Sequence, residues 1–332
     1  MNPQPAAAHA PGPIVAYLAG ATAVGKSDVA LLLAAKLGLE IVSIDSRQIY
    51  RGLPIGTAQP SPAERAAVRH HLLDLLDPIE PCSAGAFRLR FGEVLDDLKQ
   101  RGARGLAVGG TGLYWEAITR GLHPLPPASR EIRARHEEIL RTEGTEGLRR
   151  RLEELDPTDA ARIGRRDRQR LSRALEVLEL TGRGMEGNWR GELLPPMVHD
   201  VPAVVLSRGR GDLYRRIEQR CDRMLALGLL DEVRQALARG FPEDAPGLRT
   251  VGVRELLPFL RGEVPLQVAR DQFVRNSRRY AKRQETWIRH HLGDATQIPV
   301  APDTTPEATM AQVIAHLETL PGVRLDTPGG AG

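Results

Sequence analysis

The sequence predicts an α/β fold, in which a P-loop-type core with a parallel sheet carries an inserted helical domain. Short apolar runs that end in glycine or acidic turns alternate with helical segments, which is typical of a parallel sheet. A phosphate-loop pattern lies between the first such run and the first helical segment. From about Ser129 to Thr181, helical segments follow one another with no strand candidate between them, which indicates the insertion.

The first two elements are a strand and a helix joined by a glycine-rich turn. The apolar run from Ile14 to Gly20 predicts a buried strand. The stretch "KSDVALLLAAKLG" follows, is rich in helix formers and predicts a helix that stops at Gly38, because glycine is common just past helix ends.

Two further strands are predicted in "EIVSIDS" and "GLAVGGTG", on either side of a long helix with Ser83 as its candidate N-cap. In open parallel sheets, ligands gather at the carboxyl ends of the strands. The turns at Gly20, Asp45 and Gly109 all lie at such ends. We therefore expect the functional site at this edge of the sheet.

After the helical insertion, "AVVLSRGR" (Ala203 to Arg210) predicts a strand that returns to the core, and the rest of the chain is helical and arginine-rich. We expect a disordered leader over residues 1–12, a core formed by 13–121 and 201–300, a helical insertion over 122–200, and a C-terminal segment over 301–332 with a flexible tail.

Composition indicates a soluble globular protein of the reducing cytoplasm. Of the 332 residues, 41% are apolar and 27% charged, and no apolar run approaches the roughly 20 residues of a membrane helix. The start lacks a basic segment followed by an apolar stretch, so we expect no secretory signal. Cys82 and Cys221 are too few and too far apart for a metal pattern or a disulfide framework. The net charge of +4 gives weak support for a polyanionic partner.

The phosphate loop is the most specific motif. Gly20, Gly25, Lys26 and Ser27 match the P-loop spacing between a strand and a helix. The glycines let backbone N–H groups point inward, and the helix N-terminus adds partial positive charge. Lys26 is expected to reach the distal phosphate and Ser27 to ligate Mg²⁺. The motif indicates a bound di- or triphosphate and does not identify what carries it.

Asp45 is the second candidate for chemistry. The third strand ends without the acidic residue that normally helps an ATPase hold Mg²⁺, whereas Asp45 closes the second strand. A carboxylate there could bind metal or take a proton from an incoming nucleophile. The alternative is that Asp45 and Ser46 only cap a turn.

At "DSRQIYRGLPIGTAQP" the chain resembles the bacterial tRNA dimethylallyltransferase (isopentenyltransferase) family. The resemblance runs from about Ile14 to His291 and includes "GATAVGKS", "HHLLD", "VGGTGLYWEAITRGL", "RLSRALEV", "RIEQRCDRML" and "AKRQETWIR". It implies transfer of a dimethylallyl group, with Mg²⁺, from dimethylallyl diphosphate to N6 of the adenosine at position 37 in the anticodon arm of tRNA. The phosphate loop would then hold the diphosphate of a prenyl donor. We expect a monomer without membrane association.

The resemblance also implies residue roles. Asp45 would be the general base, Thr111 would donate a hydrogen bond near the departing oxygen, and Arg220, helped by Arg216, would neutralise charge on the diphosphate. The donor diphosphate would contact Gly20, Thr22, Ala23, Val24, Gly25, Lys26 and Ser27. The tRNA would contact Asp45, Ser46, Arg47, Gln48, Thr111, Arg133, Gln169, Arg170, Leu171, Ser172, Arg173, Arg249, Arg254, Lys282, Arg283, Gln284 and Arg289.

The segment from Arg275 to His291 supports an RNA partner on its own composition. It carries six lysines and arginines against one acid, and Tyr280 and Trp287 lie between them. Basic side chains interleaved with aromatic rings suit RNA phosphates and bases. The alternative is a solvated basic helix with Trp287 in the core.

Two other functions fit part of the sequence. An ATP-dependent small-molecule or nucleoside kinase would share the phosphate loop and the core, but it would not explain the basic segment near the C-terminus. A P-loop RNA-binding switch without group transfer would couple nucleotide hydrolysis to RNA release.

Overall fold

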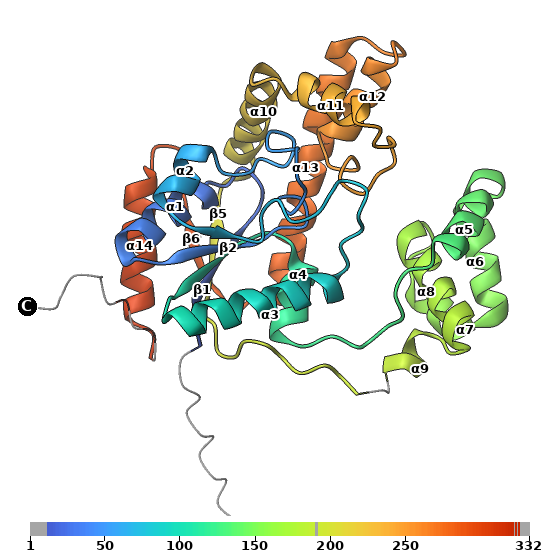
Figure 1. The fold of residues 1–332 in the computed structure, drawn as a ribbon, viewed down its shortest axis with the longest axis horizontal. Helices are drawn as coiled ribbons and strands as arrows, with labels where there is room; N and C mark the ends of the chain where they lie inside the picture. The colour runs from blue at the N-terminus through green and yellow to red at the C-terminus, as the bar shows by residue number, and fades with distance from the viewer. Residues whose placement is uncertain (1–11, 190–191, 322, 324, 326–332) are drawn as a thin grey trace, which may run out of the picture. The chain divides into compact units, whose positions relative to one another are not determined.

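The computed structural model describes residues 12–189, 192–321, 323 and 325 and divides into two compact units (Figure 1). Unit 1 takes in the described residues of Met1–Thr119 and Met197–Gly332, and unit 2 is Arg120–Pro196. The leader expected over residues 1–12, apart from Gly12, and the expected tail "DTPGGAG" lie outside the described residues. The domain boundaries drawn from the sequence stay a prediction.

Unit 1 contains a parallel sheet of six strands in the order β3-β2-β4-β1-β5-β6. The strands are β1 (Ile14–Gly20), β2 (Glu40–Ile44), β3 (His70–His71), β4 (Gly105–Gly109), β5 (Ala203–Ser207) and β6 (Thr296–Pro299). The α/β prediction is therefore confirmed, together with the four strands that the sequence analysis expected. It missed the edge strands β3 and β6, because a run of two to four residues shows no periodicity.

The sheet separates two apolar layers, and alternate residues of β1 serve each of them. Leu18 packs with Leu33 of α1 (Lys26–Leu37) and Val313 of α14 (Pro306–Glu318). On the other side, Tyr17 packs with residues of α3 (Ala84–Arg101) and α4 (Gly112–Thr119), and it stacks on Trp115 with ring centroids 3.9 Å apart. This alternation follows from the two-residue period of a strand.

Local signals set the ends of the main helices. Gly38 caps α1 in the left-handed region at φ 60°, and the Ser83 side chain caps α3 by accepting the Ala86 N–H, so both predicted caps are confirmed. The remaining helices of unit 1 are α2 (Pro62–Ala67), α10 (Arg210–Ala226), α11 (Leu229–Ala238), α12 (Val253–Leu260) and α13 (Leu266–His291).

Unit 2 has its own small core of leucines and alanines, among them Leu148, Leu152 and Leu175. Its helices are α5 (Arg130–Thr142), α6 (Gly144–Leu155), α7 (Pro157–Arg162), α8 (Arg168–Thr181) and α9 (Met185–Trp189). One antiparallel bridge joins Leu122 and Leu194. Of the helices in the described part of the chain, none combines the length and the apolar character needed to span a bilayer.

Candidate active site

The phosphate loop joins β1 to α1 and depends on glycine at its first position. Gly20 has φ 152°, and a Cβ atom there would lie 2.7 Å from the backbone oxygen of Leu206 on the neighbouring strand. No other residue type fits that approach without a backbone shift. Gly25, at φ 111°, precedes the first turn of α1, whose unpaired N–H groups face the turn.

Three basic side chains bind carbonyl groups of the loop from different directions. Arg208 Nε donates to the Val24 oxygen at 2.8 Å, and Arg216 Nε donates to the Ala23 oxygen at 3.0 Å. Lys26 Nζ donates to the oxygens of Gly20 and Ala21, each at 2.8 Å. Of the loop's amides, the Thr22 N–H donates to Gln284 Oε1 at 2.8 Å and the Val24 N–H donates to the Ala21 oxygen at 3.3 Å. The N–H groups of the first turn of α1 remain for an anion.

Lys26 lies in an environment that disfavours its charge. The residue as a whole is partly exposed, but its ammonium group is enclosed by the loop. Burial, and next the charge of Arg220, lower the pKa of Lys26 to about 7, while Asp45 acts in the opposite direction. Burial also lowers the pKa of Arg220. Asp45 only partly offsets these effects, so a bound diphosphate would stabilise the charged forms of both side chains.

Asp45 follows β2 and both caps a turn and faces the cavity. Its Oδ1 accepts the N–H groups of Arg47 at 2.7 Å and Gln48 at 3.4 Å. Both hydrogen bonds use the same oxygen, so Oδ2 is available for a substrate. The capping role weighed from the sequence is therefore present, and it leaves one carboxylate oxygen for chemistry.

Thr111 is held beside Asp45 by backbone contacts. Its N–H donates to the Ile44 oxygen at 3.3 Å, and its Oγ1 accepts the Ser46 N–H at 3.0 Å. Since Oγ1 acts as an acceptor there, its proton can be donated elsewhere. Tyr280 of α13 lines the same cavity as Asp45. Burial and then the charge of Asp45 raise the pKa of Tyr280 to about 12, whereas Arg47 and a hydrogen bond with Thr111 act to lower it.

Gln284 joins the phosphate loop to the turn after β4. Its side chain is 7% exposed, Oε1 accepts the Thr22 N–H at 2.8 Å, and Nε2 donates to the Gly110 oxygen at 3.2 Å. One turn further along α13, Trp287 packs on Gly112 so closely that a Cβ there would lie 2.1 Å from the indole ring. One face of α13 therefore fixes both glycine turns of the site.

These elements surround one cavity of about 1140 Å³ in unit 1. Asp45 and Arg220 both line it, as do Arg216, Arg223 and Tyr280. Of the predicted donor residues, Thr22, Ala23, Gly25, Lys26 and Ser27 line it. Gly20 and Val24 are buried and do not line it. Thr111 does not line it either, and its Oγ1 accepts the N–H of Ser46, the residue after Asp45.

Most of the predicted tRNA residues in unit 1 lie near the cavity or on exposed surface. Gln48 lines the cavity, and Arg47 donates to the Pro246 oxygen at 2.9 Å. Arg249, Arg254, Lys282, Arg283 and Arg289 are exposed. Gln284 also lines the cavity, its side-chain amide is bonded to Thr22 and Gly110, and its contact with tRNA stays a prediction.

The predicted tRNA residues in unit 2 fall into two groups. Gln169, Arg170 and Arg133 are exposed, and Arg133 and Arg173 pair with the carboxylate of Glu176, which is 0% exposed. Ser172 is partly exposed and bonds to His136 at 3.0 Å. Leu171 is also 0% exposed and packs in the core of unit 2, so its side chain does not face a partner. The RNA role stays a prediction for the exposed members.

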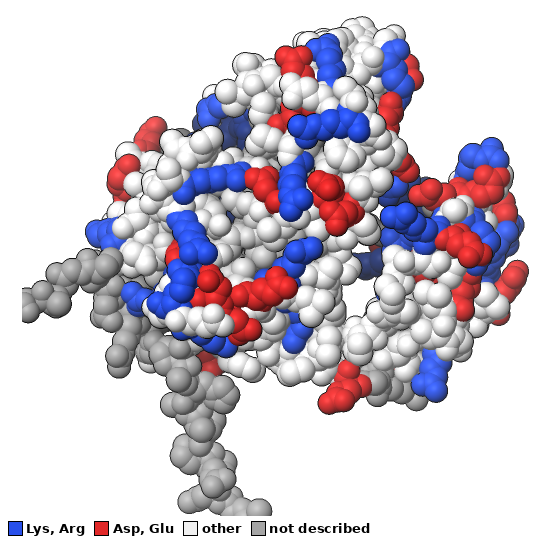
Figure 2. Space-filling view, viewed as in Figure 1, with Lys and Arg blue, Asp and Glu red and all other residues white. Residues whose placement is uncertain are grey.

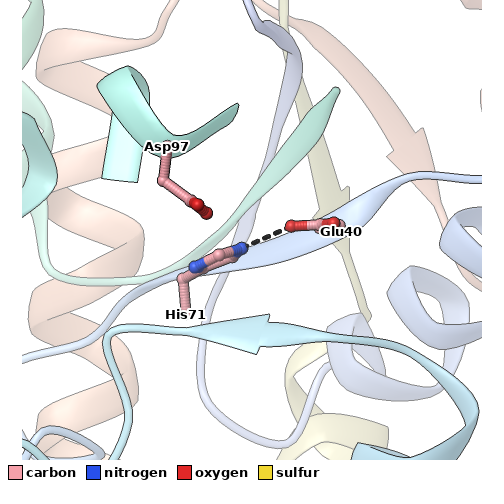
Figure 3. Close-up of side chains that lie close together, drawn as sticks. All are labelled: Glu40, His71 and Asp97. Carbon is pink, nitrogen blue, oxygen red and sulfur yellow. Dashed lines mark hydrogen bonds and ion pairs between the residues drawn. The ribbon is translucent and has the colours of Figure 1, made fainter. Parts of the chain in front are cut away.

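Two groups of oxygen and nitrogen atoms could be considered for a metal. Ser27 and Asp28 line the cavity next to Lys26 and offer the oxygen ligands that Mg²⁺ prefers. Glu40, His71 and Asp97 cluster at the amino end of β2, away from Asp45, with Glu40 Oε2 2.6 Å from His71 Nε2 (Figure 3). Arg101 already binds both oxygens of Glu40, so this cluster is satisfied as an ion-pair network.

The surface charge does not by itself identify a binding face. On the side shown in Figure 2, lysines and arginines are interspersed with aspartates and glutamates, so no patch of one sign dominates this view.

Sequence reasoning identified the phosphate loop, Asp45 and Arg220, which line the cavity, but missed the roles of Tyr280 and Gln284. Tyr280 and Gln284 are four residues apart, and Trp287 follows three residues later. This helical spacing could have indicated a face of the helix that points inward.

Family models and known proteins that are similar to this chain support the same kind of site. A model of the family described as IPP transferase matches residues 48–291, and one described as isopentenyl transferase matches residues 13–79. The tRNA dimethylallyltransferase of Halorhodospira halophila is 44% identical over 277 residues, 83% of this chain and 89% of that protein. That of Maricaulis maris is 40% identical over 301 residues, covering 90% and 96%.

Solved structures give the same result. The tRNA isopentenylpyrophosphate transferase of Bacillus halodurans is 33% identical, with a TM-score of 0.66 and coverage of 92% of this chain and 96% of that one. A eukaryotic dimethylallyltransferase acting on tRNA has a TM-score of 0.74 at 25% identity, covering 91% and 77%. The chain belongs to the IPP transferase family.

Proposed function

We propose that this protein transfers a dimethylallyl group from dimethylallyl diphosphate to N6 of the adenosine at position 37 of tRNA, releasing diphosphate. One observation carries the proposal: the phosphate loop and Asp45 line the same cavity. A phosphate cradle beside a carboxylate suits a reaction in which a diphosphate leaves while a nucleophile loses a proton. The kinase alternative is not favoured, because the relatives are named as tRNA prenyltransferases.

The donor diphosphate would bind to the amides of the loop and to Lys26. Arg216, Arg220 and Arg223 follow one another along the cavity-facing side of α10 and supply further positive charge. As the C–O bond breaks, its electron pair leaves with the diphosphate, and preformed cations stabilise the added negative charge. We assign this role to Arg220, because it lines the cavity together with Lys26 and Asp45.

The acceptor nitrogen needs activation because its lone pair is delocalised into the adenine ring. Asp45 would accept the N6 proton through Oδ2 as the new C–N bond forms at the allylic carbon. Thr111 would donate a hydrogen bond from its hydroxyl group near the oxygen that leaves. The fixed hydrogen bonds of Asp45 to Arg47 and Gln48 hold the carboxylate in place for this transfer.

A divalent metal fits the family's diphosphate chemistry, and we propose Mg²⁺. Ser27 is exposed at the start of α1 and lines the cavity together with Asp28, so both can offer oxygen ligands. When bound, the ion would neutralise charge on the diphosphate. The exposed basic residues of α13 would hold the phosphates of the anticodon arm. A monomer in the cytoplasm is part of the same proposal and rests on the resemblance alone.

The test is incubation with labelled dimethylallyl diphosphate, ATP and tRNA that lacks the modification. The proposed reaction transfers label to tRNA and leaves ATP intact. A kinase would consume ATP without labelling tRNA. A nucleotide-driven RNA switch would hydrolyse ATP only in step with RNA release, so either result contradicts the proposal.

A further inference from the structure

The cavity-facing side of α10 changes from charged to apolar along its length. Arg216, Arg220, Arg223 and Leu227 recur at helical spacing, and all four line the cavity. Arg216 bonds to the phosphate loop, whereas Leu227 lies at the C-cap, about 16 Å further along at 1.5 Å per residue. Met224 lines the same cavity one turn before the end. The cavity lining is therefore cationic near the loop and apolar near the end of α10, where Leu227 is still 64% exposed.

The segment after Gly52 supplies the facing wall. Pro54, Ile55, Thr57 and Ala58 all line the cavity. This segment contains no helix or strand, yet its backbone is tightly held. Gln48 Nε2 donates to the Ala58 oxygen at 2.8 Å, and Gln59 Nε2 donates to the oxygens of Gln48 and Tyr50 at 2.8 and 2.9 Å. The wall is thus connected to the strand end that carries Asp45.

Glu232, in the first turn of α11, binds the backbone of this segment at two positions. Its Oε2 accepts the Ile55 N–H and its Oε1 accepts the Gly56 N–H, both at 2.7 Å. The residue is only 8% exposed. Burial raises the pKa of its carboxyl, and the two amide hydrogen bonds act against that rise. Among the described residues Glu232 has no cationic partner, so the two amide hydrogen bonds must offset the cost of burying this carboxylate.

Gly56 lets the segment approach α11 this closely. A Cβ atom at this position would lie 2.8 Å from Val253 Cγ2, 3.1 Å from Glu232 Oε1 and 3.3 Å from Leu229 Cδ1. The back of the segment is therefore packed against α11 and α12, and its front faces the cavity. The segment cannot move outward without compressing these contacts, and it cannot move inward without leaving Glu232.

We propose that Glu232 is a positioning residue that fixes the apolar wall of the cavity, and that this wall selects donors by the length of their prenyl chain. The inference rests on the proposed function, because it requires an allylic diphosphate in the cavity. With the diphosphate held at the phosphate loop, a short prenyl chain points toward the apolar part. Ile55, Met224 and Leu227 would then limit how long that chain can be.

The experiment compares kcat/KM for dimethylallyl diphosphate with kcat/KM for geranyl diphosphate, whose chain is twice as long, using unmodified tRNA. In Glu232→Gln one of the two buried N–H groups loses its acceptor, so we expect the ratio of the two values to fall about tenfold. Ile55→Ala should shift the ratio in the same direction while leaving Glu232 in place. It is the second test if the first variant does not fold.

Glu40→Gln is the matched control, since Glu40 is also a well-bonded carboxylate but lies at the opposite end of the sheet. It should leave the donor ratio unchanged even where it lowers stability. An unchanged ratio in both Glu232→Gln and Ile55→Ala, with an active wild type, would overturn the inference alone. A wild type that labels no tRNA from either donor would overturn the proposed function and the inference with it.

Discussion

Helix α13 presents two faces with opposite properties. On the inner face, Tyr280, Gln284 and Trp287 contact Thr111, Gly110 and Gly112 at the site. On the outer face, Arg275, Arg279 and Lys282 are exposed, and within the described residues none of the three forms an ion pair. Arg275 and Arg279 are four residues apart, and such a pair of like charges destabilises a helix by about 0.2–0.5 kcal/mol.

The two faces of α13 therefore suit two different roles. The inner face holds buried polar groups at fixed distances, which is what a reaction between two aligned groups requires. The outer face keeps cations without counter-charges, which is what a polyanion requires. Substitutions on the inner face should therefore alter the reaction rate without altering the salt dependence of tRNA affinity. Substitutions on the outer face should alter that salt dependence without altering the reaction rate.

The largest effect is expected at Asp45, on the cavity side. Asp45→Asn keeps an oxygen for the Arg47 N–H but cannot accept the N6 proton. We expect kcat to fall by about 10²–10⁴-fold, the usual range for a general base. Donor affinity, measured by calorimetry with dimethylallyl diphosphate, should stay within about threefold of wild type, because the phosphate loop is untouched. Normal turnover would remove Asp45 from the role of base.

Gln284→Met is the next largest perturbation and tests the inner face itself. The change keeps the side-chain volume but removes the acceptor for the Thr22 N–H and the donor to the Gly110 oxygen. An unpaired buried group costs about 1–3 kcal/mol, so kcat/KM for the donor should fall about tenfold to a hundredfold. The slope of tRNA affinity against salt should not change. A reduced slope with a normal rate would instead return Gln284 to the tRNA-contacting set.

Much of the fold and part of the site were predictable from the sequence. The phosphate loop, the strand ends and the caps at Gly38 and Ser83 are local patterns, and each is present. The roles of Gln284 and Glu232 were not predictable, because each depends on a contact across more than 170 residues of chain. The burial of the Leu171 side chain was not predicted either, because a tRNA-contacting segment on a helix also has an inward face.

The charge of Lys26 is expected to have an effect of intermediate size on donor affinity. With a pKa of about 7 in the free protein, Lys26 is increasingly neutral above that pH, so donor binding must take up a proton. The Kd for the donor should rise by up to about tenfold per pH unit above 7. Lys26→Arg keeps its charge, and its affinity should be flatter over the same range. Equal pH dependence in both proteins would contradict this account.

The same lowered pKa has a consequence for stability. The unfolded chain holds this proton up to its ordinary pKa of 10.5, while the folded chain releases it near 7. The unfolded state therefore binds more protons in this window, and the contribution of Lys26 to the free energy of unfolding rises with pH from about 7 to 10.5. Below pH 7 the full cost of burying the charge remains.

The smallest effect is expected on the outer face, at Arg283. Its guanidinium carbon lies 5.7 Å from the Tyr280 ring centroid, and the side chain is exposed. If Arg283 contacts one phosphate, Arg283→Gln should lower the slope of log affinity against log salt by about 0.7–0.9 and weaken tRNA binding severalfold. Turnover at saturating tRNA should be little changed, because the inner face is intact. Lys36→Gln, at the far end of α1, removes the same charge from an exposed site and should leave the slope alone. Equal slopes in Arg283→Gln and Lys36→Gln would mean that net charge, and not the placement of cations on α13, determines tRNA affinity, and the contrast between the two faces would fail on its outer side.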